Sequence, residues 1–395
     1  MRLSISKKEI KSRQKRFWEN LQQQDLDCAI IFSPIDIFYL TGFFFHPTER
    51  PIAFFVDSNQ KTHLFVPFLE KEHAEEFSGA INFVHSYPEY PGIKHPMEYF
   101  KEDLIAAGFQ GKRVGADSLG YASASGYRGP SIDQLLEAKE YQSIKDMVPA
   151  LRMIKSDEEI ELIKESCRWG NLAHRLLQKY SKAGISEMEI TSRASTESTL
   201  AMIETLGPEY KPHGETAFAL FRGQVGELSA YPHAVAQNVT LKKGDTLVTA
   251  AAASIWGYKS ELERTMFVEE ASSEQKTYFQ HMYNAQEVAF QHIKPGNPLS
   301  SVEVEVQRYF KENNITELTR HHTGHAIGLL FHESPFFDLG DHTIMEPGMV
   351  FTVEPGIYVN GVGGFRHSDT VLVTEDGMEM LTYYPRDLES LICSS

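Results

Sequence analysis

The chain has 395 residues, of which 42% are hydrophobic and 23% charged, and its formal net charge is −16. This length predicts two domains, and the composition is typical of a globular protein rather than a disordered one. The acidic balance argues against a nucleic-acid-binding protein and against adhesion to an anionic membrane.

The sequence gives no signal for export or membrane insertion. No apolar run approaches the roughly 18–20 residues that a membrane span needs. The basic stretch 1–17 is not followed by an apolar segment of the signal-peptide kind. The three cysteines are widely separated and predict neither a disulfide framework nor a CxxC metal site. We therefore expect a cytoplasmic protein without nucleic-acid or membrane partners.

The first 150 residues alternate helical and extended patterns. The expected helices cover 8–24 and 97–107, and the expected strands cover 27–32, 52–56, 62–66 and 113–116. This alternation predicts a small α/β domain over residues 1–150.

The remaining chain, 155–395, reads as a second domain of the α+β class. The capping boxes Ser156-x-x-Glu159 and Ser186-x-x-Glu189 predict helices that run to about 182 and 206. Further on, strand patterns fill 215–268 and 323–380, and helical patterns cover 273–292 and 300–312.

Two glutamates lie two residues apart in a predicted strand. Because alternate residues share one face of a strand, Glu261 and Glu263 should project together, away from Leu262 and Arg264. The preceding run 247–256 is almost entirely apolar, which favours a buried position. Two buried carboxylates are costly unless they bind a cation, a metal ion or a shared proton.

Histidines and a further glutamate follow in the second half of this domain. Four of the chain's 16 histidines, including His325 and His332, fall between 321 and 332 among small residues. Histidine serves both as a proton shuttle and as a metal ligand. Glu354 ends an apolar strand beside a Pro-Gly break. In 366–370, period-two alternation should put Arg366, Ser368 and Thr370 on one face of a strand.

The segments "HTGHAIGLLFHESP", "PGMVFTVEPGIYV" and "DTVLVTEDG" follow one another in the order found in the creatinase, aminopeptidase P and prolidase family. Ile154–Ile160 is also similar to that family's linker helix. The resemblance covers nearly the whole chain. It implies a pita-bread catalytic domain over 155–395, a creatinase/prolidase-like domain over 1–150, and a homodimer.

The sequence departs from the metallopeptidases of this family, which hold two ions with two aspartates, a histidine and two glutamates. His325 and Glu354 match the histidine and the first glutamate, and Glu261 matches the second aspartate. The first aspartate falls near Thr249, in an uncertain register, and the last glutamate falls on Ser368. Because serine is a poor bridging ligand for hard cations, a dinuclear site is not expected.

The segment "LERT" resembles creatinase, which has a glutamate at the position of Glu263 and uses no metal. We therefore expect a metal-independent, creatinase-like hydrolase that cleaves a C–N bond in a small amidine, guanidino or amide substrate. In this hypothesis the residue that corresponds to the creatinase histidine, His233, is the general base, and Glu263 and Glu354 hold the polarised C–N centre. His325 and His332 donate hydrogen bonds to the substrate.

Four further residues are expected to bind the substrate: Arg50, Glu261, Phe336 and Arg366. Arg366 or Arg50 would pair with a substrate carboxylate, since Arg50 resembles a creatinase arginine with that role. Phe336 replaces a second carboxylate-binding arginine of creatinase and adds an apolar wall.

Two alternatives remain open. One is a metal-dependent Xaa-Pro aminopeptidase or dipeptidase in which Glu261, His325 and Glu354 bind one divalent ion such as Mn²⁺, Zn²⁺ or Fe²⁺. The other is a non-catalytic binding protein with an eroded site.

Overall fold

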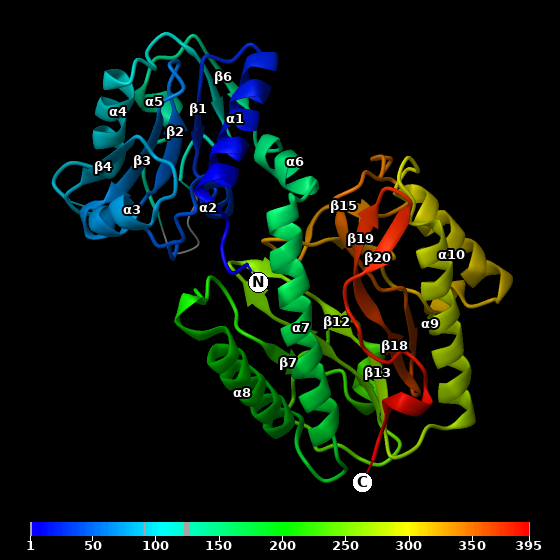
Figure 1. Ribbon diagram of the computed structural model, residues 1–395. Helices are drawn as coiled ribbons and strands as arrows, with labels where there is room; N and C mark the ends of the chain where they lie inside the picture. The colour runs from blue at the N-terminus through cyan, green and yellow to red at the C-terminus, as the bar shows by residue number, and fades with distance from the viewer. Residues whose placement is uncertain (1, 91, 122–126, 395) are drawn as a thin grey trace. The chain divides into compact units, whose positions relative to one another are not determined.

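The computed structural model describes residues 2–90, 92–121 and 127–394 (Figure 1). The chain forms two compact units. One spans Ile5–Arg152, and the other begins at Met153 and takes in the first few residues of the chain.

The N-terminal unit is built on one mixed sheet of six strands. In spatial order these are β4 (Phe83–Tyr87), β3 (Thr62–Pro67), β2 (Ala53–Val56), β1 (Cys28–Ile31), β5 (Arg113–Ala116) and β6 (Glu140–Ser143). Its helices are α1 (Lys7–Gln23), α2 (Pro34–Thr41), α3 (Lys71–Phe77), α4 (Pro96–Ala106) and α5 (Ile132–Leu135), and α6 (Met147–Met153) ends at the boundary between the units. Strand β1 is antiparallel to β2 and parallel to β5.

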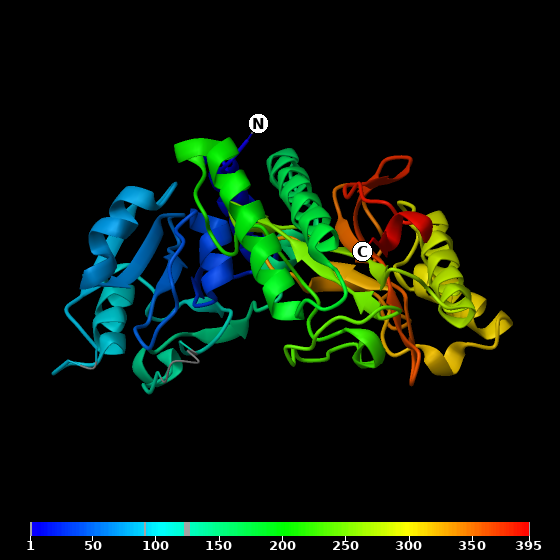
Figure 2. The same cartoon turned by 90° about the horizontal axis from the view of Figure 1, so that it is seen from below.

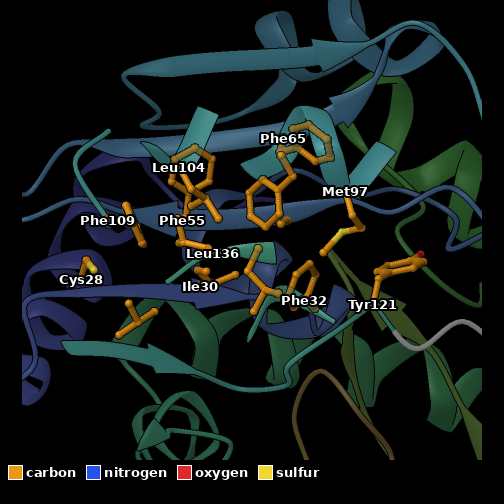
Figure 3. Packing of buried hydrophobic residues seen from close by; sticks show 14 of the residues in the cluster. Cys28, Ile30, Phe32, Phe55, Phe65, Met97, Leu104, Phe109, Tyr121 and Leu136 are labelled. Atoms are coloured by element: carbon orange, nitrogen blue, oxygen red, sulfur yellow. The ribbon is translucent and has the colours of Figure 1, made fainter. Parts of the chain in front are cut away.

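Helices cover both faces of this sheet, which explains why β1 and β2 are apolar at every position. Phe54 of β2 meets Phe17 of α1, with ring centroids 6.4 Å apart. Its neighbour Phe55 points to the opposite face and meets Phe100 of α4 at 5.5 Å. Figure 3 shows the cluster around Phe55, which Met97 and Leu104 of α4 complete.

The second unit contains the sheet that carries the candidate site. Its strands, in spatial order, are β15 (Glu333–Phe337), β14 (Gly324–Ala326), β16 (Val350–Val353), β19 (Ser368–Thr374), β12 (Leu262–Glu263), β9 (Ala250–Ala252) and β7 (Phe218–Leu220), and β20 (Gly377–Met380) pairs with β19. A small sheet joins β21 (Ile392–Cys393), β13 (Thr265–Val268) and β8 (Thr246–Val248), and two hairpins pair β10 (Ser254–Ile255) with β11 (Tyr258–Lys259) and β17 (Gly356–Val359) with β18 (Gly363–Arg366).

Two helix pairs pack on this unit, and Figures 1 and 2 show each pair side by side. The first is α7 (Asp157–Tyr180) with α8 (Glu187–Leu206), and the second is α9 (Ser273–His292) with α10 (Ser300–Glu312). Helix α7 begins with the reciprocal capping box of Ser156 and Glu159 that the sequence predicts. Among the helices of the described residues, none is long and apolar enough to cross a membrane.

Candidate active site

Four neighbouring strands bring three potential metal ligands together. His325 lies in β14, Glu354 directly follows β16, and Glu261 directly precedes β12, with β19 between these last two strands. One ligand atom from each of the three side chains lies within 4.8 Å of the others. We refer to Glu261, His325 and Glu354 as the ligand cluster.

His325 directs one ring nitrogen into this cluster. Its Nδ1 lies 3.0 Å from the carbonyl oxygen of Ala326, which accepts a hydrogen bond when Nδ1 carries the proton. Its Nε2 lies 3.2 Å from Oε1 of Glu354. This approach does not have the angle of a hydrogen bond, and Nε2 has no hydrogen-bond partner among the described residues. The lone pair of a neutral His325 is thus available to a ligand at the cluster.

Glu261 is held by two residues of β19. Ser368 Oγ donates to Oε1 of Glu261 at 2.8 Å. Thr370 Oγ1 accepts from the backbone N–H of Glu261 at 3.1 Å and donates to its carbonyl oxygen at 2.8 Å. The contact with the carboxylate shows that Ser368 lies on the face of Glu261, and Thr370, two residues further along β19, shares the face of Ser368. Ser368 therefore orients one of the three potential ligands.

The two carboxylates differ in their protonation. Burial and the charge of Glu354 raise the pKa of Glu261 to about 8. Burial alone would raise the pKa of Glu354 too, but the contact with His325 holds it well below its usual range. Burial would lower the pKa of His325, yet the contact with Glu354 and the charge of Glu261 raise it to about 9. At neutral pH the cluster thus holds protons that a metal ion would displace.

Glu263 shares the face of Glu261, as strand alternation predicts, but it is bound by Arg366 at the end of β18. Arg366 donates to both carboxylate oxygens of Glu263, through Nη2 at 2.8 Å and through Nε. Its Nε also lies 3.7 Å from Oε2 of Glu354. Arg366 Nη1 donates to the hydroxyl of Tyr358 at 2.9 Å. The cation that Glu263 holds is therefore the protein's own, and Arg366 is committed to that carboxylate rather than to a substrate.

The register of β9 corrects the position expected at Thr249. Leu262 pairs with Ala251, so Ala250 shares the face of Glu263 and Thr249 does not. Thr249 Oγ1 instead lies 2.7 Å from Nε2 of His174 and donates to the carbonyl of Arg264 at 3.0 Å, away from the cluster. A methyl group, from Ala250, therefore occupies the place where we expected the lost aspartate.

Two aromatic side chains of the predicted set border the cluster. His332 stacks on His325, with ring centroids 3.8 Å apart, and its other side is exposed to solvent. Partial burial and the charge of His325 lower the pKa of His332 to about 4, so it is neutral at pH 7. Phe336 lies opposite His325 in β15 and meets the ring of His322 at 5.5 Å.

Two predicted residues lie apart from the ligand cluster. His233 is exposed in a turn after residues 226–230, and among the described residues no hydrogen bond or ion pair joins it to Glu263 or Glu354. Arg50 belongs to the N-terminal unit, where it donates to Glu89 at 2.8 Å and pairs with Glu49. The roles expected for both residues stay predictions.

Three residues next to Glu263 were not expected from the sequence. Tyr358 and Gln224 bind Arg366, and Arg222 Nη1 lies 3.8 Å from Oε1 of Glu263. The sequence could have drawn attention to Arg222, because this arginine stands between an apolar strand and a glycine. Nothing in the sequence points to Tyr358 or Gln224, since their roles depend on side-chain contacts between distant segments.

The ligand cluster fits one divalent metal ion. It offers an imidazole nitrogen without a hydrogen-bond partner and two carboxylates, a donor set that suits Zn²⁺, Mn²⁺ or Fe²⁺. The carbonyl behind Nδ1 of His325 and the hydroxyl of Ser368 supply the outer hydrogen bonds that usually orient such ligands. No second cluster of this kind occurs within residues 2–90, 92–121 and 127–394.

The chain belongs to a known peptidase family. Residues 161–375, more than half of the chain, match Metallopeptidase family M24. Residues 13–154 match the Creatinase/Prolidase N-terminal domain. The resemblance noted in the sequence is thus confirmed, as is the two-domain fold with a pita-bread catalytic domain, and the protein is a hydrolase that acts on C–N bonds.

Its relatives match over almost their full length. An Xaa-Pro dipeptidase of Pyrococcus furiosus is 29% identical over 96% of this chain and 100% of its own. A putative dipeptidase of Bacillus subtilis is 27% identical over 93% of this chain and 96% of its own. Among solved structures, the prolidase of Pyrococcus horikoshii superposes with a TM-score of 0.79 at 26% identity, and covers 95% of this chain and 99% of its own.

These findings correct two expectations. Metal-independent, creatinase-like hydrolysis of an amidine or guanidino compound is not supported, because the matched family is one of metallopeptidases and the relatives above are dipeptidases. The expectation that the reaction needs no metal ion is therefore not supported either. The alternative of a metal-dependent Xaa-Pro peptidase is the better supported of the two.

Proposed function

We propose that this protein is a metal-dependent exopeptidase that cleaves Xaa-Pro peptide bonds and holds one divalent ion at Glu261, His325 and Glu354. The observation that carries the proposal is the buried Nε2 of His325, which lacks a hydrogen-bond partner among the described residues and faces two carboxylates. The relatives named as Xaa-Pro dipeptidases support the substrate class.

One ion rather than two is proposed because acidic residues are missing from the site. The family's last glutamate falls on Ser368, and its first aspartate, which we expected near Thr249, falls by strand register on Ala250. Neither side chain can balance a second positive charge. When bound, a divalent ion supplies Lewis-acid polarisation of a carbonyl and lowers the pKa of water.

The protein's own groups orient and balance this site. The Ala326 carbonyl and Ser368 orient His325 and Glu261 for ion binding. Arg366 neutralises Glu263 and adds positive charge 3.7 Å from Glu354. His332 is neutral at pH 7, so its ring can donate a hydrogen bond to the oxygen of a substrate carbonyl.

The proposal is tested with chelator-treated protein and synthetic peptides. Ala-Pro and Leu-Pro, together with tripeptides that have proline in second place, are assayed for release of the N-terminal residue with and without added Mn²⁺, Co²⁺ or Zn²⁺. We expect cleavage that depends on the added ion and is lost in His325→Gln. The matched control is His281→Gln, which changes a histidine of α9 that is hydrogen-bonded to Tyr309. This variant should keep the metal-dependent cleavage. The proposal would be wrong if none of these ions supported cleavage, or if the chelator-treated protein were fully active without added ion.

A further inference from the structure

Arg222 sits in a turn whose backbone conformation is unusual for an arginine. The turn follows β7, and the N–H of Gln224 donates to the carbonyl of Phe221 at 2.8 Å. Its two central residues, Arg222 and Gly223, have φ values of +53° and +75°. Side chains other than those of glycine, asparagine and aspartate are disfavoured there. Such an outlier points to function when the surroundings enforce it.

The surroundings of this turn do enforce its shape. A Cβ at Gly223 would lie 2.3 Å from the carbonyl oxygen of Val235, so the backbone of the turn is packed tightly against that segment. On its other side, Gln224 Oε1 accepts a hydrogen bond from Nη2 of Arg366 at 3.3 Å. The backbone of Arg222 is therefore held in place beside the Glu263–Arg366 pair.

The guanidinium of Arg222 keeps its donors available. Its Nη1 lies 3.8 Å from Oε1 of Glu263, which is too far for a hydrogen bond. It donates no hydrogen bond to any residue in the described ranges, and its side chain is 38% exposed. Arg366, by contrast, is buried and engaged with Glu263, Tyr358 and Gln224. Of the two guanidinium groups beside Glu263, Arg222 is the one able to bind a ligand.

Printed contacts place Arg222 near the ligand cluster. Its Nη1 lies 3.8 Å from Oε1 of Glu263, and Arg366, which binds Glu263, has its Nε 3.7 Å from Oε2 of Glu354. Arg222 thus lies beside a carboxylate that shares a strand face with Glu261 of the cluster. A local cation of this kind favours the carboxylate of a substrate, although the chain as a whole carries a net charge of −16.

We propose that Arg222 binds the free carboxylate of the substrate and thereby selects dipeptides over longer peptides. A guanidinium matches a carboxylate through two parallel hydrogen bonds. The inference rests on the proposed function, because it takes the scissile bond to lie at the ligand cluster. Arg222 would then be a residue of substrate binding rather than of metal binding.

The test compares glycyl-proline with glycyl-proline amide, which lacks the negative charge. Binding of each to chelator-treated protein is measured by isothermal titration calorimetry. We expect wild-type protein to bind the acid about tenfold or more tightly than the amide. Arg222→Met should abolish this preference. The control Arg168→Met, which removes a 76%-exposed arginine from α7, should keep it.

A second variant guards against a folding defect. Glycine suits the left-handed conformation at this position, so Arg222→Gly should keep the wild-type melting temperature while it loses the preference for the acid. Equal binding of acid and amide by the wild-type protein, or no binding of either, would overturn the inference. A preserved preference for the acid in Arg222→Met or Arg222→Gly would overturn it too. Because binding is measured without added metal, this result is separate from any failure of metal-dependent cleavage.

Discussion

Metal binding to the ligand cluster should depend steeply on pH, because two of its three ligands hold protons at pH 7 when no ion is bound. The pKa of Glu261 is raised to about 8, chiefly by burial and by the charge of Glu354. The pKa of His325 is raised to about 9, because its contact with Glu354 outweighs the effect of burial. An ion binds the deprotonated forms, so both protons must leave.

The size of the effect follows from these two pKa values. At pH 7 the solution is about one unit below the pKa of Glu261 and about two units below that of His325. The apparent affinity at pH 7 should therefore be roughly 1,000-fold weaker than its limit above pH 9. Because both values are raised, the affinity increases as the pH rises from 7 and levels off once His325 is neutral.

Calorimetric titration with Mn²⁺ measures this directly. In buffers of different ionisation enthalpy at pH 7, about two protons should be released for each ion bound. Ser368→Ala is a matched control, because Ser368 donates a hydrogen bond that lowers the pKa of Glu261. Its affinity should fall at pH 7 and approach the wild-type value above pH 9. Release of one proton or fewer, or an affinity that does not change with pH, would show that Glu261 and His325 are not both protonated at pH 7.

Three further predictions concern charge and metal capacity. Glu263→Gln should lower the free energy of unfolding by about 3–5 kcal/mol, because it leaves Arg366 buried without its carboxylate; a loss below about 1 kcal/mol in urea unfolding would contradict this. The double variant Ala250→Asp/Ser368→Glu should bind two ions where wild-type protein binds one; elemental analysis that still finds one ion would show that other features limit the site. The pKa of His63 is lowered to about 4 by burial and by His85, so charging this histidine opposes folding. The free energy of unfolding should be highest above the ordinary histidine pKa of 6.5 and should fall by up to about 3 kcal/mol as the pH drops toward 4. Urea unfolding at several pH values measures this dependence, which His63→Gln should flatten.

The fold could be predicted well from local patterns. The expected helices at 273–292 and 300–312 are α9 and α10, because their caps and periodicity are local properties. Strand alternation also placed Glu261 with Glu263, and Ser368 with Thr370, on shared faces. These inferences need no knowledge of which strands are neighbours.

The parts of the site that could not be predicted depend on pairing between distant segments. The pairing of Ala251 with Leu262 decides that Ala250, not Thr249, faces the site, and a shift of one residue reverses that assignment. Arg366 lies about a hundred residues from Glu263, and nothing local shows that it neutralises this glutamate. Without that contact, Glu263 looked available for a cationic substrate, which favoured metal-free chemistry.

Two expectations from the sequence, the homodimer and the cytoplasmic location, stay predictions. Both can be examined independently of the site, by light scattering on the purified protein and by fractionation of cells. Neither outcome changes the argument for the ligand cluster.

Whether one divalent ion at Glu261, His325 and Glu354 supports cleavage of an Xaa-Pro bond can be measured by a stoichiometric titration. Chelator-treated protein, at a concentration far above its dissociation constant for the ion, receives increasing Mn²⁺ while release of proline from Ala-Pro is followed. We predict that activity rises linearly and reaches its plateau at one equivalent of ion, and that His325→Gln shows no such rise. Activity before any ion is added, or a plateau at two equivalents, would contradict the claim.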